Sequence, residues 1–347
     1  MNATLPAVDG ILDACQLELT ADWIASVQTP EGMIPWFEGG HSDPWNHVEA
    51  AMALDTAGRR RDAERAYEWL AASQRRDGSW YNYYVKAKCG GVFASDTKLD
   101  TNVCAYAAAG VWHHWLVTGD RGFVEAMFPL VERAIEFVLT MRRSDGGIVW
   151  ARYDGIAPWD YALVTGSASI VHSLRCAVEI AGLLGHERPA WTEAADRLAE
   201  LVRCRPDAFA SKERWSMDWY YPVLTGVITG IDALTRLRKR YDDFEHEGLG
   251  IRCVSDQPWV TAAETCECSI AHLAVGERDA AVQLFAAAQS HRLDDGSYLT
   301  GLVYPDKVQF PAAEATTYTA AAVILAADAL SGATNASTLF TEHTLTT

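Results

Sequence analysis

Carboxylic acids and aromatic side chains recur together at the starts of alanine-rich apolar segments in this 347-residue chain. The acids near such starts are Asp43, Glu49, Asp96, Asp100, Asp154, Asp160, Asp218, Asp256, Glu264 and Glu314. The aromatic residues interleaved with them are Trp36, Trp45, Trp80, Tyr83, Tyr84, Trp159, Tyr161, Trp215, Trp219, Tyr220, Trp259, Tyr304 and Tyr318. A sugar ring has an apolar C–H face and a hydroxyl edge, so this pairing of residue types suits a saccharide chain.

Two of these acids have the local settings that hydrolysis of a glycosidic bond requires. The reaction needs one protonated and one ionised carboxyl group, roughly 6.5–9.5 Å apart when the anomeric centre inverts. Asp43 precedes Pro44 as a predicted helix N-cap, where free N–H groups favour the ionised base. Glu264 follows Ala262 and Ala263 inside an apolar helix, where burial favours the protonated acid. We therefore predict Asp43 and Glu264 as the catalytic pair of an inverting glycosidase, with Glu267 and Glu314 as substitutes.

The other predicted contacts with the saccharide are Trp36, Trp45, His47, Asp96, Asp100, Trp159, Asp160, Trp219, Tyr220, Trp259, Glu314 and Tyr318. For any single acid, a purely structural role as a helix cap is the more economical interpretation, and the tryptophans could simply plug a barrel mouth. Taken together on one face, the acids and aromatic residues favour a functional cleft.

Helical periodicity accounts for most of the chain, and every stretch that could be a strand is short and lies between helices. The predicted helices are 12–28, 46–57, 61–75, 100–118, 123–142, 162–184, 190–203, 222–240, 258–275, 278–291 and 315–330, with a weak further helix at 237–247. Charged amphipathic helices alternate with alanine-rich ones. Asp-Gly turns, as at Asp77-Gly78, follow the charged helices and suit backbone that needs positive φ.

This alternation predicts an all-α fold, an (α/α)6 toroid in which alanine-rich helices form the inner layer. The inner segments begin at Asn46, Asp100, Ala162, Pro222, Pro258 and Ala315. No break in composition divides the chain, so we predict one catalytic domain over residues 1–331 and a polar C-terminal tail over 332–347. Neighbouring inner helices stand ~8–10 Å apart. The helices of Asp43 and Glu264 would then lie two places apart, and inward side chains could approach the inverting distance.

The repeated element at Gln74–Trp80 resembles those of terpene cyclases and protein prenyltransferases. The two-layer helical pattern with acids on loops, over roughly residues 10–330, is similar to the (α/α)6-barrel glycosidases. Within that group the chain most resembles the actinobacterial methylmannose polysaccharide hydrolases. This resemblance implies a glycoside hydrolase acting on an α-mannan-like chain. In glucoamylase-like relatives a late inner-helix acid often supplies the base, so the resemblance leaves open that the roles of Asp43 and Glu264 are exchanged.

Other chemistry has weaker support in the sequence. No Asp-x-Asp-Asp motif of a class II terpene cyclase occurs, and no phosphate loop or Gly-x-Ser-x-Gly elbow. Cys268 and His272 could share a helix face, but Cys266 lies about 160° away from Cys268, so two ligands alone do not close a zinc site. We predict that these residues pack in the core and that the protein uses no metal and no cofactor.

The net charge of -17 argues against nucleic-acid or anionic-membrane partners. Eight cysteines, mostly inside helical segments, and the lack of a signal peptide or an 18-residue apolar run predict a cytoplasmic protein. Acids around the rim favour a neutral, possibly O-methylated glycan, while the oligomeric state stays open. The alternatives are a sugar epimerase or isomerase, which would need paired rim histidines such as His41 and His47, a prenyltransferase or terpene-cyclase-like protein, and a non-catalytic glycan binder.

Overall fold

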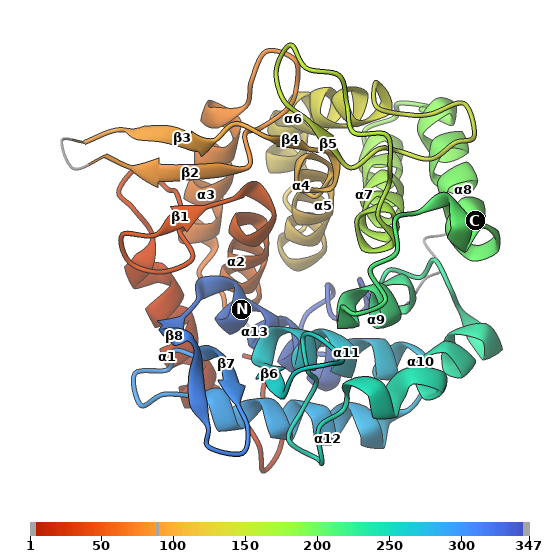
Figure 1. Ribbon diagram of the computed structural model, residues 1–347. Helices are drawn as coiled ribbons and strands as arrows, with labels where there is room; N and C mark the ends of the chain where they lie inside the picture. The colour runs from red at the N-terminus through yellow and green to blue at the C-terminus, as the bar shows by residue number, and fades with distance from the viewer. Residues whose placement is uncertain (1–4, 88–89, 343–347) are drawn as a thin grey trace.

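A ring of apolar helices, most of them rich in alanine, forms the centre of the computed structural model, which describes residues 5–87 and 90–342. Within those residues the ring consists of α2 (Pro44–Thr56), α4 with α5 (Thr101–Ala105 and Ala107–Thr118), α7 (Val164–Leu183), α9 (Ser216–Leu224), α11 (Ala262–Ala274) and α13 (Thr317–Ser331). Each contacts the next in this order, and α13 contacts α2, so the ring is closed (Figure 1).

A second layer of more charged helices surrounds the ring. It contains α1 (Ala14–Val27), α3 (Arg60–Ser73), α6 (Arg121–Leu139), α8 (Pro189–Cys204), α10 (Gly230–Phe244) and α12 (Arg278–Ala288). The pairs α2 with α3, α5 with α6, α7 with α8, α9 with α10, α11 with α12, and α13 with α1 are each in contact (Figure 1). The layers differ in composition because the inner helices are crowded from both sides. In α2 the residues from His47 to Thr56 are all buried, whereas α10 buries only three.

The start of the first inner helix is as the sequence predicts. Asp43 is the N-cap of α2, its side chain accepts from the backbone N–H of Asn46 (3.0 Å), and Pro44 is the first helical residue. Asp100 caps α4 in the same way, so that helix begins at Thr101, one residue after the predicted start, and Asp96 ends strand β3. The N-termini of the inner helices therefore gather at one face of the ring, which we call the rim.

The prediction of an all-α fold omits three small antiparallel sheets. One contains β1 (His41–Ser42), β2 (Tyr83–Lys86) and β3 (Val92–Asp96), and a second pairs β4 (Leu99–Asp100) with β5 (Ala151–Arg152). The third contains β6 (Trp259–Thr261), β7 (Leu299–Val303) and β8 (Val308–Ala315). Strands β1, β4, β6 and β8 lead directly into inner helices, so the sheets lie at the rim. Glu314 lies in β8, two residues before the N-cap of α13.

The predicted helix over 222–240 is wrong, because the chain breaks there into two helices. Pro222 lies inside α9, and the chain turns over residues 225–229 before α10 begins. Gly226 and Gly230 have φ values of 66° and 61°, a backbone conformation that favours glycine and ends regular helix. The fifth outer helix, predicted as a weak segment at 237–247, is accordingly the full helix α10. Short 3-10 turns at Pro206–Ala208 and Gln289–His291 follow α8 and α12.

Hydrogen bonds between residues far apart in sequence close the ring at the rim. The Thr317 backbone N–H donates to the Trp36 carbonyl (2.7 Å), and the Thr317 hydroxyl donates to the Pro35 carbonyl (2.8 Å). At the opposite face, Ala336 and Leu339 of the predicted polar tail are buried, and Phe340 stacks on His172 with ring centroids 4.8 Å apart. Residues 343–347 lie outside the described residues. Among the described helices, none is long and apolar enough to cross a membrane.

Gly110 sets the distance between α5 and its neighbours. A Cβ at this position would lie 2.4 Å from Val48 Cγ1 and 2.8 Å from the Tyr67 hydroxyl. Gly110→Ala is therefore expected to destabilise the protein by about 1–3 kcal/mol, the usual cost of overpacking a core. Gly182→Ala is the matched control, because a Cβ there meets nothing within 4 Å and alanine is the better helix former. Urea denaturation of both variants measures the difference, and equal stabilities would contradict this interpretation.

Candidate active site

Asp43 lies at the rim with three N–H donors directed at its carboxylate. The Trp36 indole and the Asn46 side-chain amide each donate to Oδ2 at 2.7 Å, and the Asn46 backbone donates to Oδ1 at 3.0 Å. Burial raises the pKa of Asp43 above its ordinary value, although these donors lower it. The direction is thus opposite to the one predicted from the N-cap alone, because burial outweighs the donors.

Glu264 lies in the first turn of α11 and keeps part of its surface exposed, whereas Ala263 and Thr265 beside it are buried. Burial raises the pKa of Glu264, as the sequence predicts, and the nearby Thr261 hydroxyl opposes this only in part. The two carboxyl groups thus differ in their surroundings. Asp43 has three donors that favour its ionised form, while Glu264 has far less support for a negative charge.

Tyr318 lies in the part of the ring between the helices of the two acids. It stands in the first turn of α13, which contacts both α2 of Asp43 and α11 of Glu264. The Trp36 ring, bonded to Asp43, packs edge-on against Tyr318 with centroids 5.0 Å apart. Burial, and after it the charge of Glu264, raises the pKa of Tyr318. His41 and Tyr83 complete this aromatic group, with ring centroids 4.3 Å apart.

A second pair of carboxyl groups, Glu49 and Glu267, lies deeper along the ring axis. Glu49 accepts from the Trp45 indole (2.8 Å) and the Tyr106 hydroxyl (3.2 Å), and Glu267 accepts from the Tyr220 hydroxyl. Burial and the repulsion from Glu49 raise the pKa of Glu267 well above its ordinary value. Both line a cavity of about 20 Å³ with Tyr221 and Phe340, among others. The sequence interpretation missed Tyr106 and Tyr221, whose only signal is a polar aromatic residue inside an apolar inner helix.

The buried Glu49 makes stability depend on pH. Burial, opposed by the Trp45 and Tyr106 donors, raises the pKa of Glu49 from 4.5 to about 7. The folded protein therefore holds a proton that the unfolded chain loses, so this stabilisation is present below pH 4.5 and disappears as pH rises to about 7. The wild type should lose unfolding free energy as the pH rises from 5 to 8, and Glu49→Gln should lose about 1–3 kcal/mol less over the same interval. Urea denaturation at pH 5 and at pH 8 measures this difference, and Glu38→Gln, at an exposed position, is the control. If the unfolding free energy of Glu49→Gln changes with pH as much as that of the wild type, the interpretation is wrong.

Further rim residues predicted to bind saccharide lie on the side of α4. Asp96 accepts from the Asn82 amide (3.0 Å), and Lys98 lies 3.7 Å from the Asp100 carboxylate. The Lys98 ammonium also lies over the Trp150 ring, which packs against Trp159 with centroids 5.0 Å apart. On the opposite side, Trp259 stacks on Phe310 (4.7 Å) and the Thr300 hydroxyl donates to Glu314 (3.3 Å).

Three predicted contact residues do not join this group. His47 is buried between α2 and α3, where Nδ1 accepts from the Ile34 N–H and Nε2 bonds the Ala66 carbonyl. Trp219 packs outward on α10, and its indole donates to the Arg236 carbonyl (2.9 Å). Both turn away from the axis because helical phase directs them to the outer layer. Asp160 is exposed on the loop before α7.

The cysteine cluster on α11 lies in the core. Cys266 and Cys268 are fully buried, and His272 Nδ1 lies 2.9 Å from Glu277. Cys104, Cys176 and Cys253 are also buried, while Cys15 and Cys204 are exposed and Cys89 lies outside the described residues. No group of three or more potential metal ligands occurs among the residues that the structure describes.

Comparison with known proteins gives one relative over nearly the whole chain. The MMP endo-(1,4)-3-O-methyl-alpha-D-mannosidase of Mycolicibacterium hassiacum is 49% identical over 336 residues, which cover 97% of this chain and 92% of that protein. An uncharacterized glycosyl hydrolase of Methanocaldococcus jannaschii is 33% identical over 89 residues, 25% of this chain and 14% of its own length. No family model matches the chain.

Solved structures with the same fold include a wild-type glycosidase, with a TM-score of 0.73 and 13% identity over 92% of this chain and 98% of that one. A sugar epimerase from a ruminal bacterium has a TM-score of 0.65 and 10% identity, and the match covers 90% of this chain and 98% of the epimerase chain. At these identities the likeness shows the fold alone. None of the four proteins is a terpene cyclase or prenyltransferase, so that resemblance gains no support. The near full-length match shows that the chain belongs to the family of the M. hassiacum mannosidase and is a glycosidase.

Proposed function

We propose that the chain is an (α/α)6-barrel endo-glycosidase that cleaves a neutral α-(1,4)-linked oligosaccharide of 3-O-methylmannose. The closed inner ring and its surrounding layer support the barrel assignment. The substrate class follows the printed name of the near full-length relative. The barrel extends to about residue 331, and the described residues after it pack against its far face through Leu339 and Phe340.

The observation that carries the proposal is the setting of Asp43 and Glu264 at the starts of α2 and α11, the two inner helices on either side of α13. Burial raises the pKa of both carboxyl groups, but at Asp43 three N–H donors oppose it, so Asp43 acts as the base that activates water. At Glu264 fewer groups oppose the effect of burial, so Glu264 acts as the acid that protonates the leaving oxygen. A water between two such carboxyl groups attacks the face of the sugar opposite the leaving group, so the anomeric centre inverts.

The aromatic rim supplies the platforms for a chain of sugars. Trp36, Tyr83 and Tyr318 form one aromatic group near Asp43. Trp159 packs on Trp150 in the part of the rim that contains Asp100, and Trp259 belongs to β6 of the third sheet. All of these aromatic side chains keep part of their surface exposed. Platforms spread over several inner-helix starts suit an enzyme that cuts inside a chain, since sugars then bind on both sides of the cleaved bond.

Proton NMR of the protein with a defined 3-O-methyl-α-(1,4)-mannose oligosaccharide tests the proposal. We expect internal cleavage and the β-anomer of the new reducing end as the first product. The α-anomer appearing first would show retention and overturn the assignment of an inverting pair. Absence of cleavage would overturn the substrate class.

The epimerase alternative has less support at this site. The rim near Asp43 offers His41, but His47 is bound by two backbone groups between α2 and α3. The pair of rim histidines that this alternative requires is therefore not formed by these two residues. In the same NMR experiment, a change of sugar configuration without bond cleavage would favour the epimerase.

A further inference from the structure

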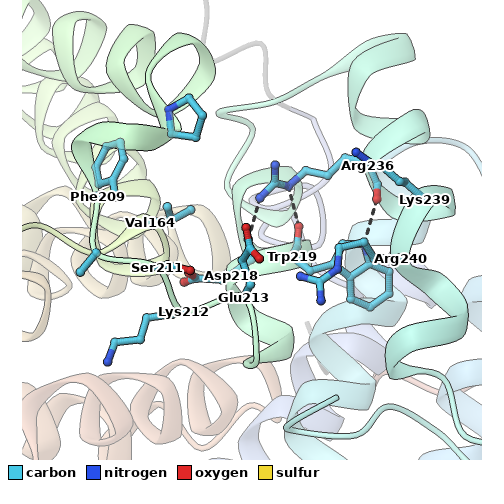
Figure 2. A pocket seen from close by; sticks show the side chains of 12 residues that line it. Val164, Phe209, Ser211, Lys212, Glu213, Asp218, Trp219, Arg236, Lys239 and Arg240 are labelled. Carbon is cyan, nitrogen blue, oxygen red and sulfur yellow. Dashed lines mark hydrogen bonds between the residues drawn. The ribbon is translucent and has the colours of Figure 1, made fainter. Parts of the chain in front are cut away.

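A cavity of about 370 Å³ opens beside the α9 part of the rim, within the size range of small-molecule sites. Val164 at the start of α7, Asp218 in the first turn of α9 and Lys239 in the last turns of α10 line it. Inner helices begin and outer helices end at this face, so the cavity opens on the same side of the ring as Asp43 and Glu264. Figure 2 shows Arg236, Lys239 and Arg240 of α10 on one side of it and Phe209 and Lys212 on the other.

The lining contains four cationic side chains, Lys212, Arg236, Lys239 and Arg240, together with the carboxyl groups of Glu213 and Asp218. Arg236 is fixed by the carbonyls of Trp219 (2.8 Å) and Asp218 (2.7 Å). Within the described part of the chain, Arg236, Lys212 and Lys239 form no ion pair, whereas Arg240 pairs with Asp243. The Asp218 carboxylate already accepts from the Thr165 hydroxyl (2.6 Å). Val164 and Phe209 add apolar surface, so the cavity combines free donors with apolar walls.

The cavity lies on the Glu264 side of the rim. The turn that ends at Ser216 contains Lys212, and the Ser216 backbone N–H donates to the Cys253 carbonyl (3.0 Å). The segment of Cys253 pairs in turn with strand β6 through a bridge between Arg252 and Val260, and β6 leads into α11. Helix α9 also contacts α11, whose first turn carries Glu264, so the cavity lies on the side of the ring next to this acid.

Trp215 stands in the same turn and is 47% exposed, although the Arg214 guanidinium lies 5.6 Å from its ring centre. Its backbone N–H donates to the Lys212 carbonyl (2.7 Å), so Trp215 is held in the turn whose residues Lys212 and Glu213 line the cavity. A large exposed aromatic surface beside a donor-rich cavity is typical of a binding site rather than of a core.

We propose that this cavity, with Trp215 in the adjacent turn, binds the leaving-group part of the oligosaccharide, and the inference rests on the proposed function. A methoxyl group on a sugar accepts hydrogen bonds but cannot donate them, and its methyl group prefers apolar contact. The Lys212 and Lys239 ammonium groups can donate to the sugar oxygens, while Phe209 and Val164 offer apolar contact to the methyl groups. The apolar contact is what a hydroxyl group cannot make, so we expect the cavity to favour methylated sugars on the side of the bond that Glu264 protonates.

The test compares Trp215→Ala and Lys212→Ala with the control Ile231→Ala. Ile231 is 73% exposed at the start of α10, on the opposite face of the ring. For long methylated oligosaccharides we expect Trp215→Ala to raise KM about tenfold and Lys212→Ala to raise it severalfold, with kcat kept. The shortest cleavable substrates should respond less, and the preference over an unmethylated chain of equal length should shrink. The control should match the wild type.

Binding of the same oligosaccharides, measured by calorimetry without reference to cleavage, separates the two proposals. Wild-type KM and Kd in both variants at every chain length would overturn the cavity assignment and leave the proposed function intact. If the wild type cleaves none of these oligosaccharides but the two variants bind them more weakly than the wild type does, the result supports the cavity as a binding site and overturns the proposed function.

Discussion

Asp43→Asn is expected to lower kcat about 10²–10⁴-fold while saccharide binding persists, the range in which a positioned general base contributes. Asparagine retains an oxygen that can accept from the Asn46 N–H, and it is also a good N-cap, so α2 should stay folded. The amide cannot take a proton from water at neutral pH. Its NH2 group would also meet the Trp36 indole or the Asn46 amide, both of which are donors. Steady-state kinetics with calorimetric Kd values measure the two effects separately.

Asp13→Asn is the matched control for that variant. Asp13 is the N-cap of α1, accepts from the Gln16 N–H at 2.8 Å, and is exposed away from the ring. The control should keep wild-type kcat and Kd. Wild-type turnover in Asp43→Asn would remove Asp43 from the mechanism, whereas a loss of binding equal to the loss of turnover would assign it to substrate recognition.

Glu264→Gln is expected to lower kcat by a similar factor, but only for substrates that need protonation of the leaving group. Natural sugar leaving groups should lose about 10²–10⁴-fold, and aryl glycosides with acidic phenols should lose far less. Kinetics over a series of leaving groups measures this difference. Glu267→Gln is the informative comparison, because Glu267 lies one turn further along α11 and is held by Tyr220. A dependence on the leaving group in Glu267→Gln, and not in Glu264→Gln, would transfer the role of acid to Glu267.

The pH profile gives a second readout of the same pair. The base must be ionised, so activity falls as pH drops through the pKa of Asp43. The acid must be protonated, so activity falls as pH rises through the pKa of Glu264. Burial raises both pKa values, so both limbs should lie at higher pH than for ordinary carboxyl groups. Removing Glu264 should abolish the alkaline limb and leave the acidic limb in place.

The sequence predicts those features that local chemistry determines. Asp43 and Pro44 determine the start of α2, and alanine-rich segments identify most of the inner helices because small side chains allow close packing from both sides. Helix α9 is the exception, since it has no alanine and buries Trp219, Tyr220 and Tyr221. The path between α9 and α10 could not be read in this way. Helical periodicity continues through Pro222, and the break depends on positive φ at Gly226 and Gly230.

The predicted contact list departs from the structure where side-chain direction decides the outcome. Trp219 and Tyr220 are neighbours in sequence, yet one packs outward on α10 and the other binds Glu267 near the axis. Their phase follows from where α9 begins, at Ser216, which the sequence interpretation did not locate. The catalytic assignment of Asp43 and Glu264 is still a prediction, and the variants above decide it.

The closure of the ring by Thr317 and residues 35 and 36 has a consequence for how the protein is made. Tyr318 packs on Trp36 beside Asp43, and the ribosome adds Tyr318 some 280 residues after Trp36. A ribosome-bound chain that lacks α13 leaves α2 and α11 without the neighbour that joins them, and their apolar faces stay uncovered. The rim around Asp43 therefore forms only after nearly the whole chain has left the ribosome, when long-range contacts can form.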